Sequence, residues 1–81
     1  MQVHQRIYKQ YFSLAMDEPV QCEGCGRFNA CDVHHLLPRS LGGGNDIENL
    51  CAVCRKCHDW AHDSPDYNEY LKIRHLKKLN T

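Results

Sequence analysis

Hydrophobic positions near the start of the chain recur at the spacing of an amphipathic helix. The stretch has no Gly or Pro, and it places Ile7, Tyr8, Tyr11, Phe12 and Ala15 at helical spacing. This pattern predicts a helix from about Val3 to Ala15 with its aromatic side chains in the core. The acidic and Pro-containing segment 17–19 is expected to end it.

Two short apolar runs in the middle of the chain predict a small β-hairpin. The first runs from Ala30 to Leu37 and stops at Pro38, and the second runs from Leu50 to Val53. The loop between them contains three consecutive glycines at 42–44, which allow a sharp turn or a close approach of the backbone. A flexible linker is the alternative interpretation of these glycines.

Two helices are predicted after the hairpin. The first runs from about Arg55 to Asp63, and Ser64 followed by Pro65 then provides a cap and a start for a last helix that ends near Leu79. A chain of 81 residues holds one domain of this kind. We therefore predict a small α+β fold with an N-terminal helical segment at 1–16, a core at 22–62 and a basic C-terminal helix at 65–79.

So short a chain buries too little surface to be stable without disulfides or a bound metal, and its six cysteines could provide either. The polar opening residues show no export signal, so a cytoplasmic location is expected, where disulfides are rare. Two Cys-x-x-Cys pairs, Cys22 with Cys25 and Cys54 with Cys57, have the spacing that holds one tetrahedral zinc ion. Disulfide pairing is the alternative. The other two cysteines, at 31 and 51, are expected to be small buried strand residues or, less directly, replacement ligands.

Four of the six histidines form two tight groups. His58 and His62 lie four residues apart, so they project from one face of a helix and can bind one ion together. His34 and His35 are adjacent on a strand, where neighbours point to opposite faces. One of them can complete the metal set while the other faces a substrate as a base, and a twist or bulge would let both serve one cleft.

The same cysteines and histidines fit two other patterns literally. Residues 54–58 read C-x-x-C-H, as in covalent haem attachment, but this requires export and a distal ligand. Residues 58–62 read H-D-x-x-H, with a carboxylate about one methylene shorter than in the H-E-x-x-H of zinc proteases. The haem pattern also leaves the other cysteine pair and the histidine cluster unexplained.

Together, His34-His35, Asn49-Leu50, Cys54-x-x-Cys57-His58 and His62 resemble the HNH, or ββα-metal, endonuclease family. The resemblance covers about residues 22–62 and implies hydrolysis of DNA phosphodiester bonds with 5′-phosphate products, by nicking or double-strand cleavage. It implies a ββα-metal core clamped by the four-cysteine zinc site, as in small stand-alone proteins of phages and mobile elements.

The resemblance also implies roles for single residues. His35 would be the general base, Asn49 would bridge the loop and steady that base, and His58 would belong to both the catalytic and the metal-binding set. His34 would bind the catalytic divalent ion with His58, and His62 would be the additional ligand of members with an all-histidine set. The sequence leaves Mg²⁺, Mn²⁺, Ni²⁺ and Zn²⁺ open as this ion, although imidazole ligands suit the softer ions and Mg²⁺ prefers oxygen ligands.

Charge along the chain is uneven although the formal net charge is zero. Residues 1–16 and 72–81 carry basic residues and no acidic ones. The centre of the chain carries ten acidic and four basic residues, which gives it a formal charge of about −6. Candidate DNA contacts are Arg39, Arg55, Lys56, Lys72, Arg74, Lys77 and Lys78. For each of them, a solvated surface position without a DNA contact is an equally good explanation.

The expected partner is DNA, in double-stranded form, with no membrane association and with monomer and dimer both open. A non-catalytic zinc module that binds DNA, or a zinc module that binds proteins, would keep the four cysteines. Neither would need His35 beside an open metal site.

Overall fold

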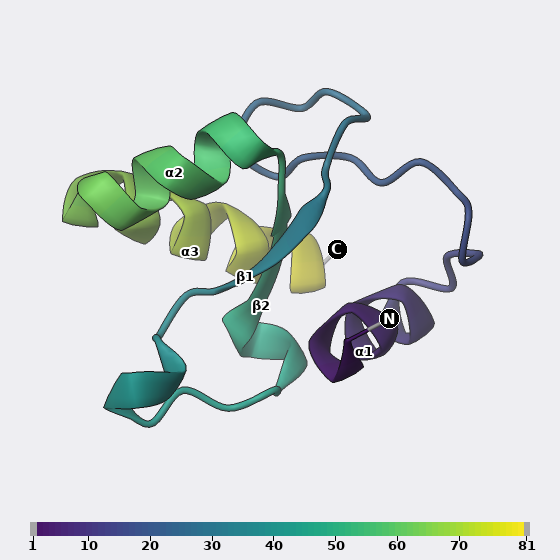
Figure 1. Ribbon diagram of the computed structural model, residues 1–81, viewed down its shortest axis with the longest axis horizontal. Coiled ribbons are helices and arrows are strands. Elements are labelled where there is room, and N and C mark those ends of the chain that lie inside the picture. Colours follow the sequence, from purple (N-terminus) through teal and green to yellow (C-terminus); the bar gives the residue numbers. More distant parts are fainter. Residues whose placement is uncertain (1, 81) are drawn as a thin grey trace.

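The computed structural model describes residues 2–80 and has a two-stranded sheet between helices (Figure 1). The helices are α1 (Val3–Tyr11), α2 (Arg55–Asp63) and α3 (Pro65–Leu79), and the strands are β1 (Asp32–His35) and β2 (Leu50–Val53). Two short 3-10 turns, Arg39–Leu41 and Ile47–Asn49, lie in the loop that joins the strands. Among residues 2–80, none of the helices is both long and apolar enough to cross a bilayer. The small α+β fold predicted from the sequence is confirmed.

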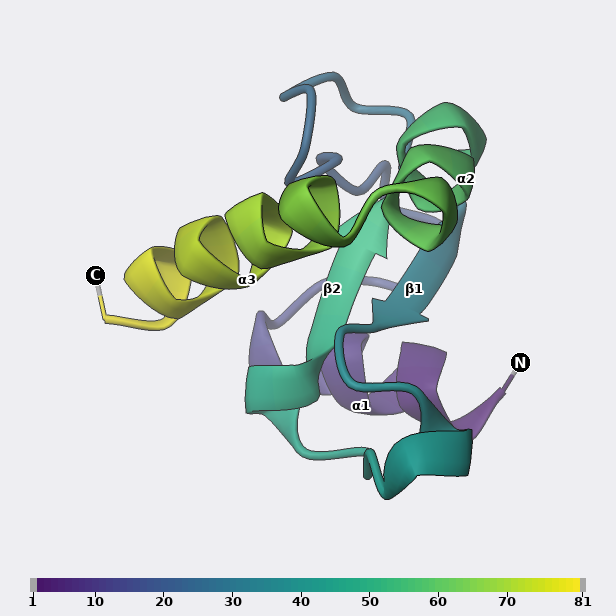
Figure 2. The same ribbon diagram turned by 90° about the vertical axis from the view of Figure 1, so that its left-hand side faces the viewer.

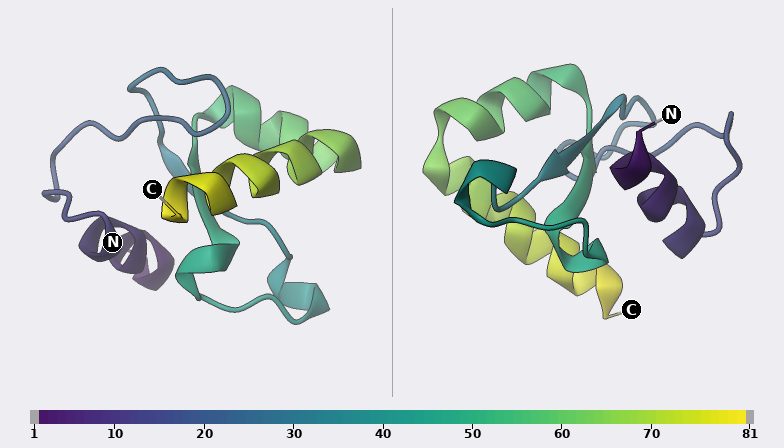
Figure 3. Two further views of the ribbon diagram at one scale, coloured as in Figure 1. Left: turned by 180° about the vertical axis from the view of Figure 1, so that it is seen from behind. Right: turned by 60° about the horizontal axis from the view of Figure 1, so that its bottom comes forward.

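The antiparallel hairpin separates two layers of helix. His34 pairs with Cys51 and His35 with Leu50 across the sheet. Helix α1 packs on one face of the hairpin, while α2 and α3 pack against each other and cover the other face (Figures 2 and 3). Neighbouring residues of β1 therefore face different helices.

The core has one apolar cluster on each side of the sheet. Tyr8 of α1 packs with Leu50 and Ala52 on one side. On the other side Leu36, Val53, Ala61 and Leu71 pack together with Cys22, Cys51, Cys54 and Cys57. Three of the four paired cysteines, all but the exposed Cys25, thus belong to this second cluster. An ion held by all four would join the segment before β1 to the start of α2.

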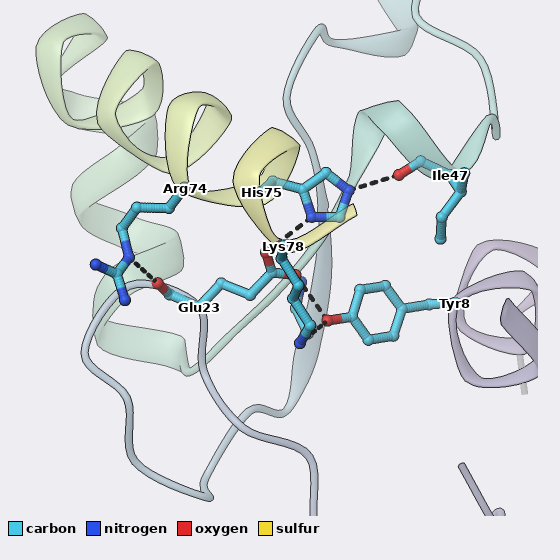
Figure 4. Close-up of polar contacts among 7 residues, drawn as sticks. Tyr8, Glu23, Ile47, Arg74, His75 and Lys78 are labelled. Atoms are coloured by element: carbon cyan, nitrogen blue, oxygen red, sulfur yellow. Dashed lines mark hydrogen bonds and ion pairs between the residues drawn. The ribbon is translucent and has the colours of Figure 1, made fainter. Parts of the chain in front are cut away.

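A buried polar network links α1 and α3 to the segment around Glu23 (Figure 4). The Glu23 carboxylate accepts hydrogen bonds from the Tyr8 hydroxyl at 2.6 Å and from His75 Nδ1 at 2.8 Å. His75 Nε2 donates to the Ile47 carbonyl at 2.6 Å. Both ring nitrogens of His75 therefore face groups that only accept, so the ring is held as a cation beside the Glu23 anion.

Two predicted elements are shorter than the sequence pattern indicated, and two exposures differ. Helix α1 ends at Tyr11 because Ser13 takes a left-handed conformation (φ 57°) and the Leu14 N–H bonds back to the Lys9 carbonyl. Tyr11, expected in the core, is 54% exposed. Strand β1 covers only residues 32–35, and Cys31, expected to be buried, is exposed.

Candidate metal and catalytic site

The four paired cysteines converge on one point. The sulfur atoms of Cys22, Cys25, Cys54 and Cys57 all lie within 4.8 Å of one another. Cys25 is exposed and the other three are buried. Four thiols at this separation are the donor set that tetrahedral zinc prefers, so the residues fit the ion.

Backbone N–H groups prepare the cysteine group for a cation. The Cys22 sulfur accepts from the Cys25 N–H, and the Cys54 sulfur accepts from the Cys57 N–H, both at 3.5 Å. Burial disfavours the Cys22 thiolate, but hydrogen bonds from the backbone of Cys25, Cys54 and Gly24 outweigh it and lower the pKa of Cys22 to about 7. Burial and the neighbouring sulfurs raise the pKa of Cys57 to about 12. Cys22 therefore favours the thiolate, whereas Cys57 favours the neutral thiol. A bound cation would stabilise the thiolate form of both.

Three histidines form a second group on the α2 side of the sheet. One ring nitrogen from each of His34, His58 and His62 lies within 4.8 Å of the others. The ring centroid of His34 is 5.1 Å from that of His58 and 5.3 Å from that of His62. The group runs from buried His34 through half-buried His58 to exposed His62. Solvent therefore reaches it from the His62 side.

Asp32 fixes the orientation of the His58 ring. The His58 Nδ1 atom lies 2.9 Å from the Asp32 carboxylate, which accepts its hydrogen. The His58 Nε2 atom is left facing the His62 Nε2 atom at 3.1 Å. Asp32 also pairs with Arg55 at 3.4 Å, so Arg55 has an intramolecular partner.

His35 faces the opposite side of β1 and meets α1. Its ring lies edge-on to that of His4, with centroids 4.9 Å apart, and its Nε2 atom is 2.9 Å from the Asn45 side-chain oxygen. Because β1 ends at His35, one cleft still reaches both faces: its lining includes His4, His34, His35, Arg39, His58 and His62. The predicted separation of His34 and His35 holds, and both line this cleft without a bulge.

Asn49 ties together the loop that carries these residues. Its side-chain oxygen accepts from the Leu37 N–H at 2.7 Å, and its amide donates to the carbonyls of Leu37 at 3.1 Å and Gly44 at 2.9 Å. A Cβ atom at Gly43 would collide with the Leu37 carbonyl. Asn49 thus closes the loop directly after His35, and Gly43 allows the close approach of the backbone that the sequence predicted.

The basic candidate residues do not form one surface. Exposed Arg39 lines the histidine cleft. Arg74 donates to the Glu23 carbonyl at 2.7 Å, and Lys78 contacts the Tyr8 hydroxyl at 3.2 Å. Lys72 lines a second hollow together with Asn68, and Lys77 lines a third together with Arg74 and Lys78.

Four residues at the site have no counterpart in the sequence-based predictions: His4, Asp32, Asn45 and Asn68. Asp32 is two residues before His34 on the same strand, so strand alternation could have placed it on the α2 face. His4 and Asn68 belong to α1 and α3, and nothing in local spacing indicates where those helices pack.

Comparison with known proteins identifies residues 22–64 as matching the HNH endonuclease family. Anaredoxin from Nostoc sp. (strain PCC 7120 / SAG 25.82 / UTEX 2576) is 38% identical over 60 residues, which are 73% of this chain and 75% of that protein. No solved structure matches.

Two nucleases are also similar over shorter shares of their length. The type IV methyl-directed restriction enzyme EcoKMcrA of Escherichia coli (strain K12) is 35% identical over 72 residues, covering 70% of this chain and 26% of the enzyme. The probable mobile endonuclease C of Enterobacteria phage T4 is 45% identical over 31 residues, covering 38% of this chain and 15% of that protein. The chain therefore corresponds to about a quarter or less of each nuclease.

Proposed function

Because this chain belongs to the HNH endonuclease family, we propose that it is a metal-dependent endonuclease that hydrolyses DNA phosphodiester bonds in the histidine cleft. The observation that carries the proposal is the arrangement of imidazoles. Three of them, from His34, His58 and His62, converge within 4.8 Å, and a fourth, from His35, lines the same cleft without belonging to the group.

The three converging histidines are the proposed ligands of a divalent ion. Burial lowers the pKa of His34, and the neighbouring His58 and His62 lower it further, although the hydrogen bond with Asn68 opposes them. The neutral ring is the form that binds metal. When bound, a divalent ion would stabilise the negative charge that develops on the phosphoryl group and the leaving oxygen.

His35 is the proposed general base. The Asn45 oxygen accepts from His35 Nε2, so Nε2 carries the hydrogen and Nδ1 keeps the lone pair that can take a proton from water. The loop closed by Asn49 keeps the backbone after His35 in place. Arg39, on the rim of the cleft, is placed to pair with a flanking phosphate.

The four cysteines are proposed to hold a structural zinc ion that is not part of the reaction. They clamp the segment that carries both strands, and Cys54 directly precedes the helix that presents His58 and His62. This ion would therefore support the site through the position of α2.

The test is cleavage of supercoiled plasmid DNA by the wild type, by His35→Ala and by Ser40→Ala, an exposed change in the same loop. Each protein receives Mg²⁺, Mn²⁺, Ni²⁺ or Zn²⁺ in a separate reaction, after circular dichroism has shown it to be folded. We expect wild type and Ser40→Ala to cut with at least one ion and His35→Ala to be slower by about 100-fold or more.

Other outcomes would contradict the proposal. If none of the proteins cuts but the wild type retards DNA on a gel, the chain is a non-catalytic DNA-binding module. If none cuts and none binds DNA, a protein-interaction module is the better explanation.

A further inference from the structure

We infer that Asn68 is a positioning residue of the proposed metal site: it holds His34 in the tautomer that presents Nδ1 to the ion, whereas His58 presents Nε2. The inference rests on the proposed function because it concerns the same histidines. It adds a residue from α3, which begins just after the family match at residues 22–64.

The orientation of the Asn68 amide follows from its two hydrogen bonds. Its Nδ2 atom lies 2.9 Å from the Leu36 carbonyl, which can only accept, so the NH₂ group must point there. Its Oδ1 atom then faces His34 Nε2 at 2.7 Å. An amide oxygen can only accept, so His34 Nε2 must carry the hydrogen.

This assignment leaves His34 Nδ1 as the nitrogen with a free lone pair. His34 is 6% exposed, so little water can replace Asn68 as the partner of its N–H. Without Asn68, the buried Nε2–H would lose its acceptor, and the ring would be free to change its tautomer or rotate. His58 is held in the opposite tautomer, because the Asp32 carboxylate accepts from its Nδ1 atom.

The first turn of helix α3 positions Asn68 beside His34. Ser64 caps the helix by accepting from the Tyr67 N–H, and the Asn68 N–H bonds to the Ser64 carbonyl. The side chain of Asn68 then bridges His34, the last-but-one residue of β1, and Leu36, just past that strand. Helix α3 therefore contributes a group to the site in addition to its apolar packing. Ligand histidines commonly have such an outer partner, and its loss lowers metal affinity by about 10–100-fold.

The first experiment measures binding of Co²⁺ to protein whose cysteine site already holds one equivalent of zinc. Absorption of the bound Co²⁺ is followed for the wild type, Asn68→Ala, Asn68→Asp and the exposed control Asn29→Ala. We expect Asn68→Ala to bind about 10–100-fold more weakly and Asn29→Ala to match the wild type. Asn68→Asp keeps an acceptor for His34 Nε2 and should recover much of the loss. Equal affinity in wild type and a folded Asn68→Ala would overturn the inference.

The second experiment reads the tautomer directly from ¹⁵N chemical shifts of the imidazole nitrogens in zinc-loaded protein before Co²⁺ is added. We expect His34 to carry its proton on Nε2 and His58 on Nδ1. A proton on His34 Nδ1 would overturn the inference even if cobalt binds. A wild type that binds no ion at the histidines and cuts no DNA would instead contradict the proposed function, and the tautomers would still decide the role of Asn68.

Discussion

His75 is the residue at which a buried charge pair makes the stability of this protein depend on pH. Burial disfavours the charged ring, but its hydrogen bonds to Glu23 and to the Ile47 carbonyl, with the negative charge of Glu23, outweigh burial and raise the pKa of His75. A raised folded-state pKa contributes stability that is complete below the unfolded value of about 6.5. That stability is lost as the pH rises through the folded-state pKa.

The predicted experiment compares urea unfolding of zinc-loaded wild type and His75→Gln at several pH values from about 6 to 9. The variant leaves Glu23 without its buried cation, so at about pH 6 it should be less stable by roughly 3 kcal/mol. The difference between the two proteins should shrink as the pH rises. The cysteines and the other histidines are common to both proteins and largely cancel. A difference that stays constant or grows with pH would show that His75 is not held as a cation.

The residues of the site differ in how far the sequence could predict them. The spacing of four between His58 and His62 and the alternation of His34 and His35 are properties of one helix and one strand, so local geometry was sufficient. The partners of their ring nitrogens were not accessible in this way. Asn68 reaches His34 only because α3 folds back against the hairpin, across 34 residues of sequence.

At the level of elements, β2, α2 and α3 have the predicted bounds, whereas α1 and β1 are shorter. Helix α1 ends early because Ser13 takes a left-handed conformation, which the sequence does not predict because the residue is not Gly. Strand β1 begins late because the Ala30 N–H bonds to the Val20 carbonyl, which lies outside the hairpin. The end of α1 and the start of β1 thus depend on contacts made by irregular segments. The start of α3, in contrast, follows from the cap at Ser64 that the sequence predicted, whereas the cap of α2 at Cys54 was not predicted.

The position of α2 is predicted to depend on the cysteine site. Replacing Cys25 by Ser should lower the free energy of unfolding by about 4 kcal/mol or more, because the loss of a structural metal is among the largest single-residue effects. Cys31→Ser is the matched control, since Cys31 is exposed and lies outside the group of four. It should change stability by less than about 0.5 kcal/mol.

Thermal unfolding and metal analysis of purified protein check this prediction. Wild type and Cys31→Ser should contain one equivalent of zinc that a chelator removes with loss of helical signal, and Cys25→Ser should contain little. Iron in place of zinc would contradict the assignment of the ion, because tetrahedral sulfur sites accept both metals. Equal stability of the two variants would contradict the structural role of the site.

At the scale of the whole molecule, the basic residues Arg39 and Lys77 differ in their position relative to the histidine cleft. Arg39 lies on the histidine cleft. Lys77 lies nine residues beyond Asn68 on α3, about 14 Å further along the helix axis, and lines a hollow near Glu23 and Arg74. DNA bound in the cleft is therefore expected to meet Arg39 and not Lys77.

This difference predicts how each substitution changes the salt dependence of DNA binding. A phosphate contact contributes about 0.9 to the slope of log K against log salt concentration. Arg39→Ala should therefore weaken binding and reduce the slope by about 1, whereas Lys77→Ala should leave both nearly unchanged. Fluorescence anisotropy of a labelled duplex at several salt concentrations, without a divalent ion, measures this apart from cleavage. The reverse result would place DNA along the C-terminal end of α3 and would contradict DNA binding in the histidine cleft.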